Sequence, residues 1–116
     1  MSADDSRVLE IRTYALRPGT RGEYHRIFQE RALPLLRAYG IRVVRAGPCL
    51  EDENSYVLIR GFRSLAERDE QEERFYGSDD WRDELREEVL GRIESYLTVV
   101  VPVSAAAVEA LAAAPG

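Results

Sequence analysis

Polar and apolar residues alternate along the first stretch of the chain, which reads VLEIRTYALRPG from position 8. This period of two predicts a β-strand over residues 7–16, because successive side chains of a strand point to opposite faces. One face would be small and mostly apolar, and the other would carry Glu10, Arg12 and Tyr14. Pro18 and Gly19 form a turn signal that ends the strand.

A helix should follow this strand. Thr20 and Glu23 form a capping box, which places the helix N-terminus at Thr20. Pro34 has no backbone N–H and should kink the helix or split it in two. Gly40 should end it, since glycine adopts the left-handed conformation that follows many helices.

Three further strands are predicted by runs of β-branched and apolar residues. Residues 41–49 (IRVVRAGPC) and 56–62 (YVLIRGF) are separated by the polar loop EDENS, which indicates a hairpin. Residues 96–103 (YLTVVVPV) form the last strand and are apolar on both faces. A strand of this kind is usually buried on both faces.

Two more helical segments should lie between the last two strands. A second capping box, Ser64 and Glu67, opens the first segment. Its acid-rich run, residues 67–73, is interpreted as a solvated face, and the residues it should bury are Leu65, Phe75 and Tyr76. The second segment begins at Ser78 and carries a core stripe at four-residue spacing: Trp81, Leu85, Val89 and Ile93.

The resulting order of strand, helix, strand, strand, helix and strand is the ferredoxin-like split βαβ arrangement. We therefore predict an α+β fold with a four-stranded antiparallel sheet and helices on one face. Right-handed crossovers put the first strand in the middle, between the third and the fourth. The domain would span residues 7–103, and the Ala-rich tail, 104–116, would be a short helix or a frayed end.

The sheet face without helices would need a cover, because the last strand is apolar on both sides. We expect a second copy of the chain there, so that two sheets pair as a dimeric α+β barrel. The row of Glu10, Arg12 and Tyr14 would then be at least partly buried, with Arg60 on the neighbouring strand pointing the same way. Buried charges need partners, so a Glu–Arg network is expected.

Composition limits the classes of partner. A length of 116 residues fits one domain. The net charge of -5 argues against nucleic acid or an anionic membrane as the main partner. The chain has no apolar run long enough to span a membrane, and MSADDSR lacks the pattern of a secretory leader. Its one cysteine, Cys49, cannot form an internal disulfide, which fits a cytoplasmic setting.

Several segments, taken in order, resemble the NIPSNAP domain over roughly residues 8–101. They are the E-x-R-x-Y strand with LRPG after it, the segment LPLLRAYG, and FYGSDDW. The resemblance implies a dimeric α+β barrel related to the small antibiotic-biosynthesis-type monooxygenases and to stress-responsive barrel proteins. That superfamily includes cofactor-free oxygenases, isomerases, haem-degrading enzymes and proteins without known catalysis, so the resemblance implies no single activity.

Glu10, Arg12 and Tyr14 are the first catalytic candidates. Glu10 would be an acid or base with a pKa shifted by burial. Arg12 would bind a carboxylate, enolate or phenolate, and Tyr14 would donate a hydrogen bond to a ligand oxygen. The same three residues also suit a self-contained network that fixes strand pairing or the dimer, and both interpretations stay open.

His25, the only histidine, is the fourth catalytic candidate, as a general base; a surface position is the alternative. We expect no metal site, because zinc would need several His or Cys ligands and the chain has one of each. A single haem ligand at His25 is the remaining metal option. No phosphate-loop or dinucleotide glycine pattern is present, so no nucleotide cofactor is expected.

The candidates for ligand binding are Arg60, Tyr56, Phe28, Phe62 and Trp81. The leading hypothesis is a small-molecule enzyme without metal or nucleotide cofactor. It would act on a planar, oxygenated organic substrate by proton transfer or by cofactor-free oxygenation. The alternative is a non-catalytic, dimeric ligand-binding or scaffold protein.

Overall fold

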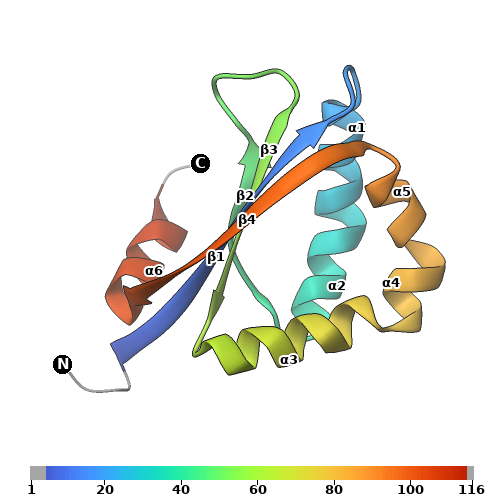
Figure 1. Ribbon diagram of the computed structural model, residues 1–116. Helices are drawn as coiled ribbons and strands as arrows, with labels where there is room; N and C mark the ends of the chain where they lie inside the picture. Colours follow the sequence, from blue (N-terminus) through green and yellow to red (C-terminus); the bar gives the residue numbers. More distant parts are fainter. Residues whose placement is uncertain (1–4, 115–116) are drawn as a thin grey trace.

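The computed structural model describes residues 5–114. A four-stranded antiparallel sheet runs through the molecule in the order β2-β3-β1-β4 (Figure 1). Its strands are β1 (Ser6–Leu16), β2 (Arg42–Pro48), β3 (Ser55–Phe62) and β4 (Ile93–Ser104). Because β1 lies between β3 and β4, the predicted ferredoxin-like α+β arrangement is confirmed.

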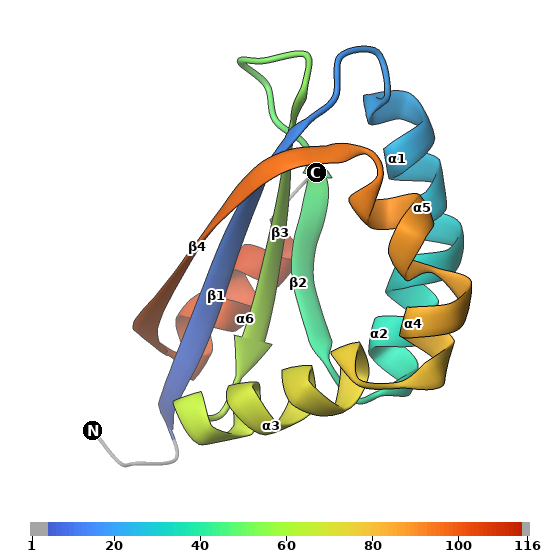
Figure 2. The ribbon, with the colours of Figure 1, turned by 45° about the vertical axis from the view of Figure 1, so that its right-hand side comes forward.

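Most of the helices cover one face of this sheet, which we call the inner face (Figures 1 and 2). Tyr14, Tyr56 and Leu58 are among its side chains in the main core. Two groups of helices pack there, and both contribute to that core. The first group is α1 (Arg21–Ile27), the π-helical turn η2 (Phe28–Ala32) and α2 (Leu33–Ala38), and the second is α3 (Leu65–Tyr76), α4 (Asp79–Glu84) and α5 (Arg86–Leu90).

The first group forms a continuous rod in which Pro34 changes the hydrogen bonding without splitting the helix. A proline ring clashes with the carbonyl four residues earlier, and the wider π turn of η2 lies directly before it. Gly40 ends the rod with a φ of 79°, as predicted. Thr20 precedes α1, but the predicted capping box is wrong, because the Thr20 hydroxyl donates to the Arg17 carbonyl at 2.7 Å.

The starts of α3 and α4 are confirmed. The Ser64 hydroxyl accepts from the backbone N–H of Glu67 at 3.1 Å, and the Ser78 hydroxyl accepts from that of Trp81 at 3.2 Å. The predicted burial of Leu65 is wrong: this side chain is exposed in the first turn of α3. Ile93 does not continue the helical stripe either, because the helix ends before it and β4 begins there.

The Ala-rich tail forms α6 (Ala105–Ala113), which packs on the opposite, outer face of the sheet (Figure 1). Val108 of α6 is buried against Leu9 and Val44, with Ile59 at the edge of this small cluster. Helices therefore lie on both faces, whereas the sequence predicted them on one. Residues 115–116 of the tail lie outside the described part of the chain.

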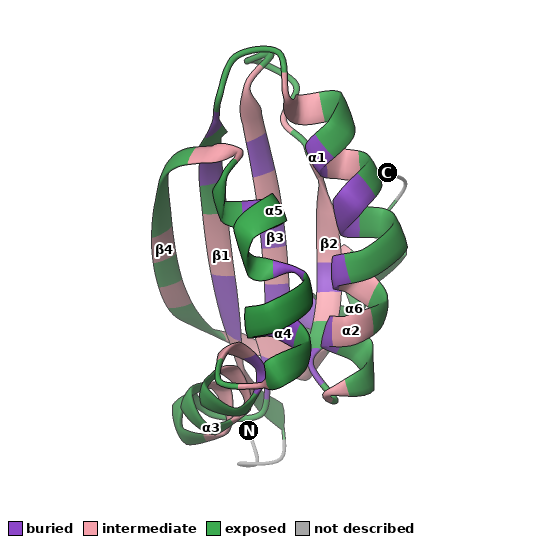
Figure 3. Cartoon of the chain, turned by 90° about the vertical axis from the view of Figure 1, so that its right-hand side faces the viewer, coloured by how far each residue is buried: buried purple, intermediate pink, exposed green. Residues whose placement is uncertain are grey.

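Beside α6, the outer face is open along β4, which is largely exposed (Figure 3). Leu97 is 76% exposed, Val99 53% and Val101 36%. The register aligns these residues with Thr13, Ile11 and Leu9 of β1, so they share one face. Within residues 5–114, no helix has the length and apolar character needed to cross a membrane.

Candidate functional site

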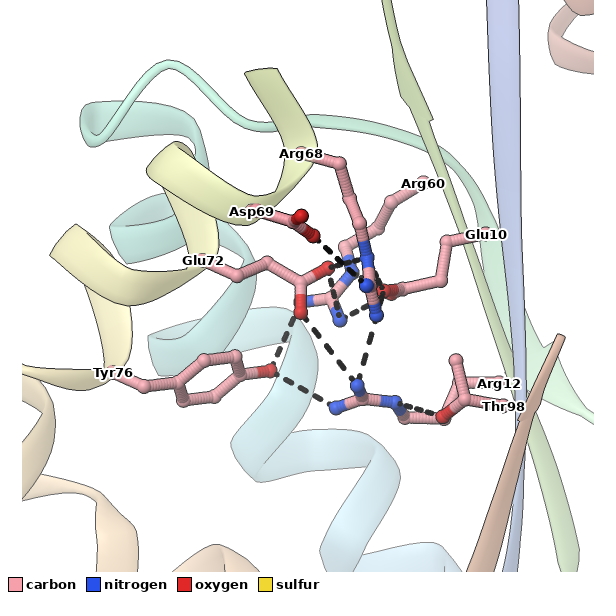
Figure 4. Close-up of polar contacts among 8 residues, drawn as sticks. All are labelled: Glu10, Arg12, Arg60, Arg68, Asp69, Glu72, Tyr76 and Thr98. Atoms are coloured by element: carbon pink, nitrogen blue, oxygen red, sulfur yellow. Dashed lines mark hydrogen bonds and ion pairs between the residues drawn. The ribbon is translucent and has the colours of Figure 1, made fainter. Parts of the chain in front are cut away.

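Glu10 and Arg12 of β1 belong to a network of charged and polar groups beside α3 (Figure 4). Glu10 and Arg60 are directly opposite each other on β1 and β3, and both side chains are fully buried. The Arg60 guanidinium donates to Glu10 Oε1 through Nε, at 2.7 Å, and through Nη2. Arg68 of α3 approaches Oε2 with Nη2 at 2.7 Å and Nε at 2.8 Å. Both oxygens of Glu10 are therefore held by guanidinium groups.

The Glu10 carboxyl is stabilised in its charged form. Burial alone would raise its pKa, but the hydrogen bond with Glu72 and the charges of Arg60 and Arg12 lower it to about 2. A carboxylate with this pKa and two arginines on its oxygens is a weak base. Its pairing with Arg60 satisfies two charges that would be costly to bury singly.

Glu72 lies on α3, one turn after Arg68, and joins the same network from the helix side. Its Oε2 is 3.2 Å from Arg60 Nη2 and 3.2 Å from Arg68 Nε, and its Oε1 is 3.7 Å from Arg12 Nη2. Burial and the hydrogen bond with Glu10 raise the pKa of Glu72 to about 7, although Arg60 and Arg68 oppose this. Glu72 is thus the carboxyl of the network that can exchange a proton near neutral pH.

Arg12 lies at the edge of the network, and its side chain is partly exposed. Its Nε donates to Thr98 Oγ1 at 2.9 Å, its Nη1 to Tyr76 Oη at 3.3 Å, and its guanidinium stacks 5.0 Å from the Tyr96 ring centre. Tyr76 Oη also accepts from Arg60 Nη1 at 2.9 Å. Because this oxygen accepts from two guanidinium groups, the Tyr76 hydroxyl has its own hydrogen left to donate.

A cavity of about 310 Å³ lies between the inner face and helices α3 to α5. Its polar end is formed by Arg12, Glu72 and Tyr76, and aromatic walls come from Tyr14, Trp81 and Tyr96. Aliphatic side chains of α5 and β4 complete it, and Arg86 also contributes to its lining. Burial raises the pKa of Tyr14 to about 12, so its hydroxyl stays protonated. A small apolar cavity with a few convergent polar groups is the usual form of a small-molecule site.

The structure brings some of the sequence candidates to this cavity and keeps others away. Arg12, Tyr14 and Trp81 line it, while Glu10 and Arg60 belong to the network behind it. Phe28 lies deeper, at a void of about 20 Å³ that Tyr14 and Trp81 also border. The remaining candidates are His25, Tyr56 and Phe62, which are not among the residues lining the cavity.

His25 and Tyr56 form a pair of their own. His25 Nδ1 lies 2.7 Å from the Tyr56 hydroxyl, and Tyr56 is fully buried. The Tyr24 ring lies between Tyr56 and Tyr14, with ring centres 4.9 Å and 5.9 Å apart. His25 therefore contacts Tyr56 and is not among the residues that line the cavity.

The sequence analysis missed the contribution of α3. Residues 67–73 were interpreted as a solvated face, and this is wrong for Arg68 and Glu72, whose side chains are 21% and 12% exposed. Tyr76, expected in the core, has its hydroxyl in the network. Arg68, Glu72 and Tyr76 recur every four residues, so they share one helix face, and this spacing was the available signal.

Among residues 5–114, no group of three or more His, Cys, Asp or Glu side chains is arranged to hold a metal ion. Glu10 and Glu72 instead have arginines as their partners.

The fold and the cavity define an α+β protein of the ferredoxin-like class with a small-molecule-sized pocket between sheet and helices. The chain belongs to the NIPSNAP family, whose sequence model matches residues 9–105. A comparison with curated proteins found no match.

Solved structures similar to the chain include two from this family. A NIPSNAP family protein of unknown function from Agrobacterium tumefaciens strain C58 is 22% identical, with a TM-score of 0.77 over 84% of this chain and 88% of that one. An uncharacterized NIPSNAP domain protein from Burkholderia xenovorans is 22% identical, with a TM-score of 0.72 over 81% of this chain and 91% of that one.

A third solved structure is also similar to the chain. A Nitrosomonas europaea protein, assigned provisionally to the antibiotic biosynthesis monooxygenases, is 14% identical, with a TM-score of 0.60 over 81% of this chain and 95% of that one. These likenesses establish a shared fold.

Proposed function

We propose that the chain is an enzyme that binds a small planar, oxygenated organic molecule in the cavity and moves a proton on it. Arg12 and Tyr76 would hold an oxygen that becomes negatively charged, and Tyr14 would donate a further hydrogen bond. Trp81 and Tyr96 would contact the planar body. The observation that carries this proposal is the meeting of Arg12, Glu72 and Tyr76 at one end of an otherwise mainly aromatic and aliphatic cavity.

Glu72 is the proton-transferring group in this proposal. Glu10 has both oxygens paired with arginines and a low pKa, and His25 does not line the cavity. Glu72 lines the cavity and has a pKa near neutrality, which suits a general base. The chemistry needs neither a metal nor a nucleotide cofactor.

A second candidate function is ligand binding or scaffolding without catalysis. It is favoured by the complete pairing of Glu10 with Arg60 and Arg68, which is what a structural network requires. This observation accounts for one of the three residues of the polar row, since Arg12 and Tyr14 line the cavity.

Two further features belong to the proposal. A second copy of the chain would cover the open strip of the outer face, giving a homodimer, because Leu97 and Val99 form an apolar surface there.

The setting would be the cytoplasm, since one cysteine provides no internal disulfide.

The proposal is tested with phenylpyruvate, a planar aromatic keto acid. A base that removes a proton from C3 leaves the electron pair on the carbonyl oxygen as an enolate, and reprotonation in D₂O places deuterium on C3. We expect the protein to speed the loss of the C3 proton signal in NMR spectra. Glu72→Gln should abolish this acceleration, and the matched variant Glu73→Gln, at an exposed position on the same helix, should keep it.

Equal rates in the two variants would contradict the role of Glu72. Binding of phenylpyruvate with no acceleration would favour the non-catalytic candidate. An oxygen electrode in the same samples distinguishes oxygenation, the other chemistry expected of this fold, because only that reaction consumes dissolved oxygen.

A further inference from the structure

Two arginines line the cavity, and they differ in their contacts. Arg12 is engaged with Glu10, Glu72, Thr98 and Tyr76. The Arg86 side chain, at the start of α5, is exposed and has no hydrogen bond or ion pair with any other residue of the described range 5–114. The charge of Arg12 is therefore already balanced by protein groups, and that of Arg86 is not.

The Arg86 side chain has no partner in the described part of the chain, although carboxylates surround it in the sequence. Asp83, Glu84, Glu87 and Glu88 all lie within three residues of it on α4 and α5. Pairs at three or four residues meet on the surface of one helix, but the break at Leu85 puts Asp83 on α4 and Arg86 on α5. Arg86 nevertheless lies against the cavity and pairs with none of them.

We infer that Arg86 is the carboxylate-binding residue of the cavity and that its ligands are planar aromatic or enolic acids rather than neutral molecules. A guanidinium presents paired N–H donors that match the two oxygens of a carboxylate. Arg86 comes from α5 and Arg12 from β1, so the ligand would be held from two sides, with Trp81 and Tyr96 as aromatic walls. This inference rests on the proposed function and names the substrate class of that site.

The size of the cavity agrees with this class. A volume of about 310 Å³ is at the lower end of the range for small-molecule pockets, which is roughly 300–1,000 Å³. A single aromatic ring with a short acidic side chain suits such a space. When Glu72 is ionised, its negative charge would also repel the carboxylate of the ligand. The ligand carboxylate would therefore lie towards Arg86.

Trp81 provides a direct measurement, because it is the only tryptophan of the chain and lines the cavity. The probes are trans-cinnamate and trans-cinnamamide, which have nearly the same shape and differ in charge. Quenching of Trp81 fluorescence reports occupancy for both. We expect the parent protein to bind cinnamate about tenfold or more tightly than cinnamamide, as one charge-assisted contact allows.

The test compares Arg86→Gln with Arg82→Gln. Arg82 lies on α4, is exposed, and is absent from the cavity lining. Arg86→Gln should lose the preference for cinnamate while keeping the affinity for cinnamamide, which also reports that the variant is folded. Arg82→Gln should retain the preference.

Three outcomes would overturn the inference. One is equal binding of both probes by the parent protein, which would exclude carboxylate recognition by Arg86 but not the proposed function of the cavity. Another is an equal loss of preference in the two variants, which would indicate a general effect of net charge. If neither probe quenches Trp81 in the parent protein, the inference and the proposed function fail together.

Discussion

Glu10 and Glu72 are chemically identical side chains of one network, yet their pKa values move in opposite directions. Burial raises the pKa of both carboxyls. For Glu10, the hydrogen bond with Glu72 and the charges of Arg60 and Arg12 outweigh burial and lower the pKa to about 2. Glu72 shares its arginines with Glu10 and ends with a pKa of about 7. The two carboxyls therefore titrate as a coupled pair, in which Glu10 keeps the charge and Glu72 exchanges the proton.

Glu10→Gln should lower the free energy of unfolding by about 3 to 5 kcal/mol, because it leaves the buried Arg60 guanidinium without its main counter-charge. Urea denaturation monitored by circular dichroism measures this change. Glu73→Gln, at an exposed position, is the control and should change the value by less than about 0.5 kcal/mol. A loss below about 1 kcal/mol for Glu10→Gln would mean that the network contributes little to folding.

The raised pKa of Glu72 predicts a pH dependence of stability. Its folded-state pKa, about 7, exceeds the ordinary value of 4.5, so its contribution is complete below pH 4.5 and is lost as the pH rises through 7. One pKa unit corresponds to about 1.4 kcal/mol, so we expect a decline of about 2 to 3 kcal/mol across this window. Glu10 acts in the other direction, and its contribution is lost as the pH falls from 4.5 towards 2.

Urea denaturation at several pH values between 4.5 and 8 measures this dependence. Glu72→Gln cannot ionise and should remove the decline. If the parent protein and Glu72→Gln give parallel curves, the pKa of Glu72 is not raised in the folded state.

Helix α3 has a polar face that is partly buried because it packs against charged residues of the sheet. Its own sequence is strongly polar, which is typical of a solvated helix, and most of it is solvated. The face that carries Arg68, Glu72 and Tyr76 instead lies over Arg60 and Arg12 of the sheet. Charged residues of the strands thus have partners on the helix, and the polar face becomes one wall of the site.

Helix α6 should contribute to stability through Val108, which is 4% exposed. Val108→Ala removes the equivalent of two methylene groups from the cluster with Leu9 and Val44, and the expected loss is about 2 kcal/mol. Leu50→Ala is the control, because Leu50 is fully exposed and its truncation should have almost no effect. Equal urea midpoints for the two variants would mean that α6 does not pack stably on the sheet.

The helices leave an apolar strip of β4 open, with Leu97 and Val99 on it. If a second copy covers this strip, the double variant Leu97→Arg with Val99→Arg should be monomeric, because two charges at the centre of an interface are costly to bury. Light scattering coupled to size-exclusion chromatography measures the mass. The parent protein and the control Leu50→Arg should be dimers, and a monomeric parent would exclude this pairing.

Much of the fold could be predicted because its signals are local. The alternation in β1, the β-branched runs of β2 and β3 and the serine caps of α3 and α4 each determine an element without reference to the rest. The position of β1 in the sheet followed from the handedness of crossovers. The packing of α6 did not follow, because an Ala-rich segment carries little indication of which face it will cover.

The site was only partly predictable, for a physical reason. Glu10, Arg12 and Arg60 share a face through strand periodicity, so their proximity was expected. The distance of His25 from the cavity depends on the angle at which α1 crosses the sheet, and the role of Glu72 depends on where α3 crosses it. No property of a single helix encodes these angles, so the sequence analysis supplied a candidate carboxyl on the strand, Glu10, and did not identify Glu72 on the helix.

The pairing of Glu10 with Arg60 across β1 and β3 also bears on how the chain reaches its fold. These strands are far apart in the sequence, so their alignment must be selected from several alternatives during folding. A slip of one residue would turn every side chain of β1 to the other face. It would move Glu10 to the outer face and leave Arg60 enclosed with the apolar side chain of Leu9 or Ile11 opposite it. The ion pair thus disfavours misaligned pairings of β1 with β3, because a slip would leave the buried Arg60 without its counter-charge.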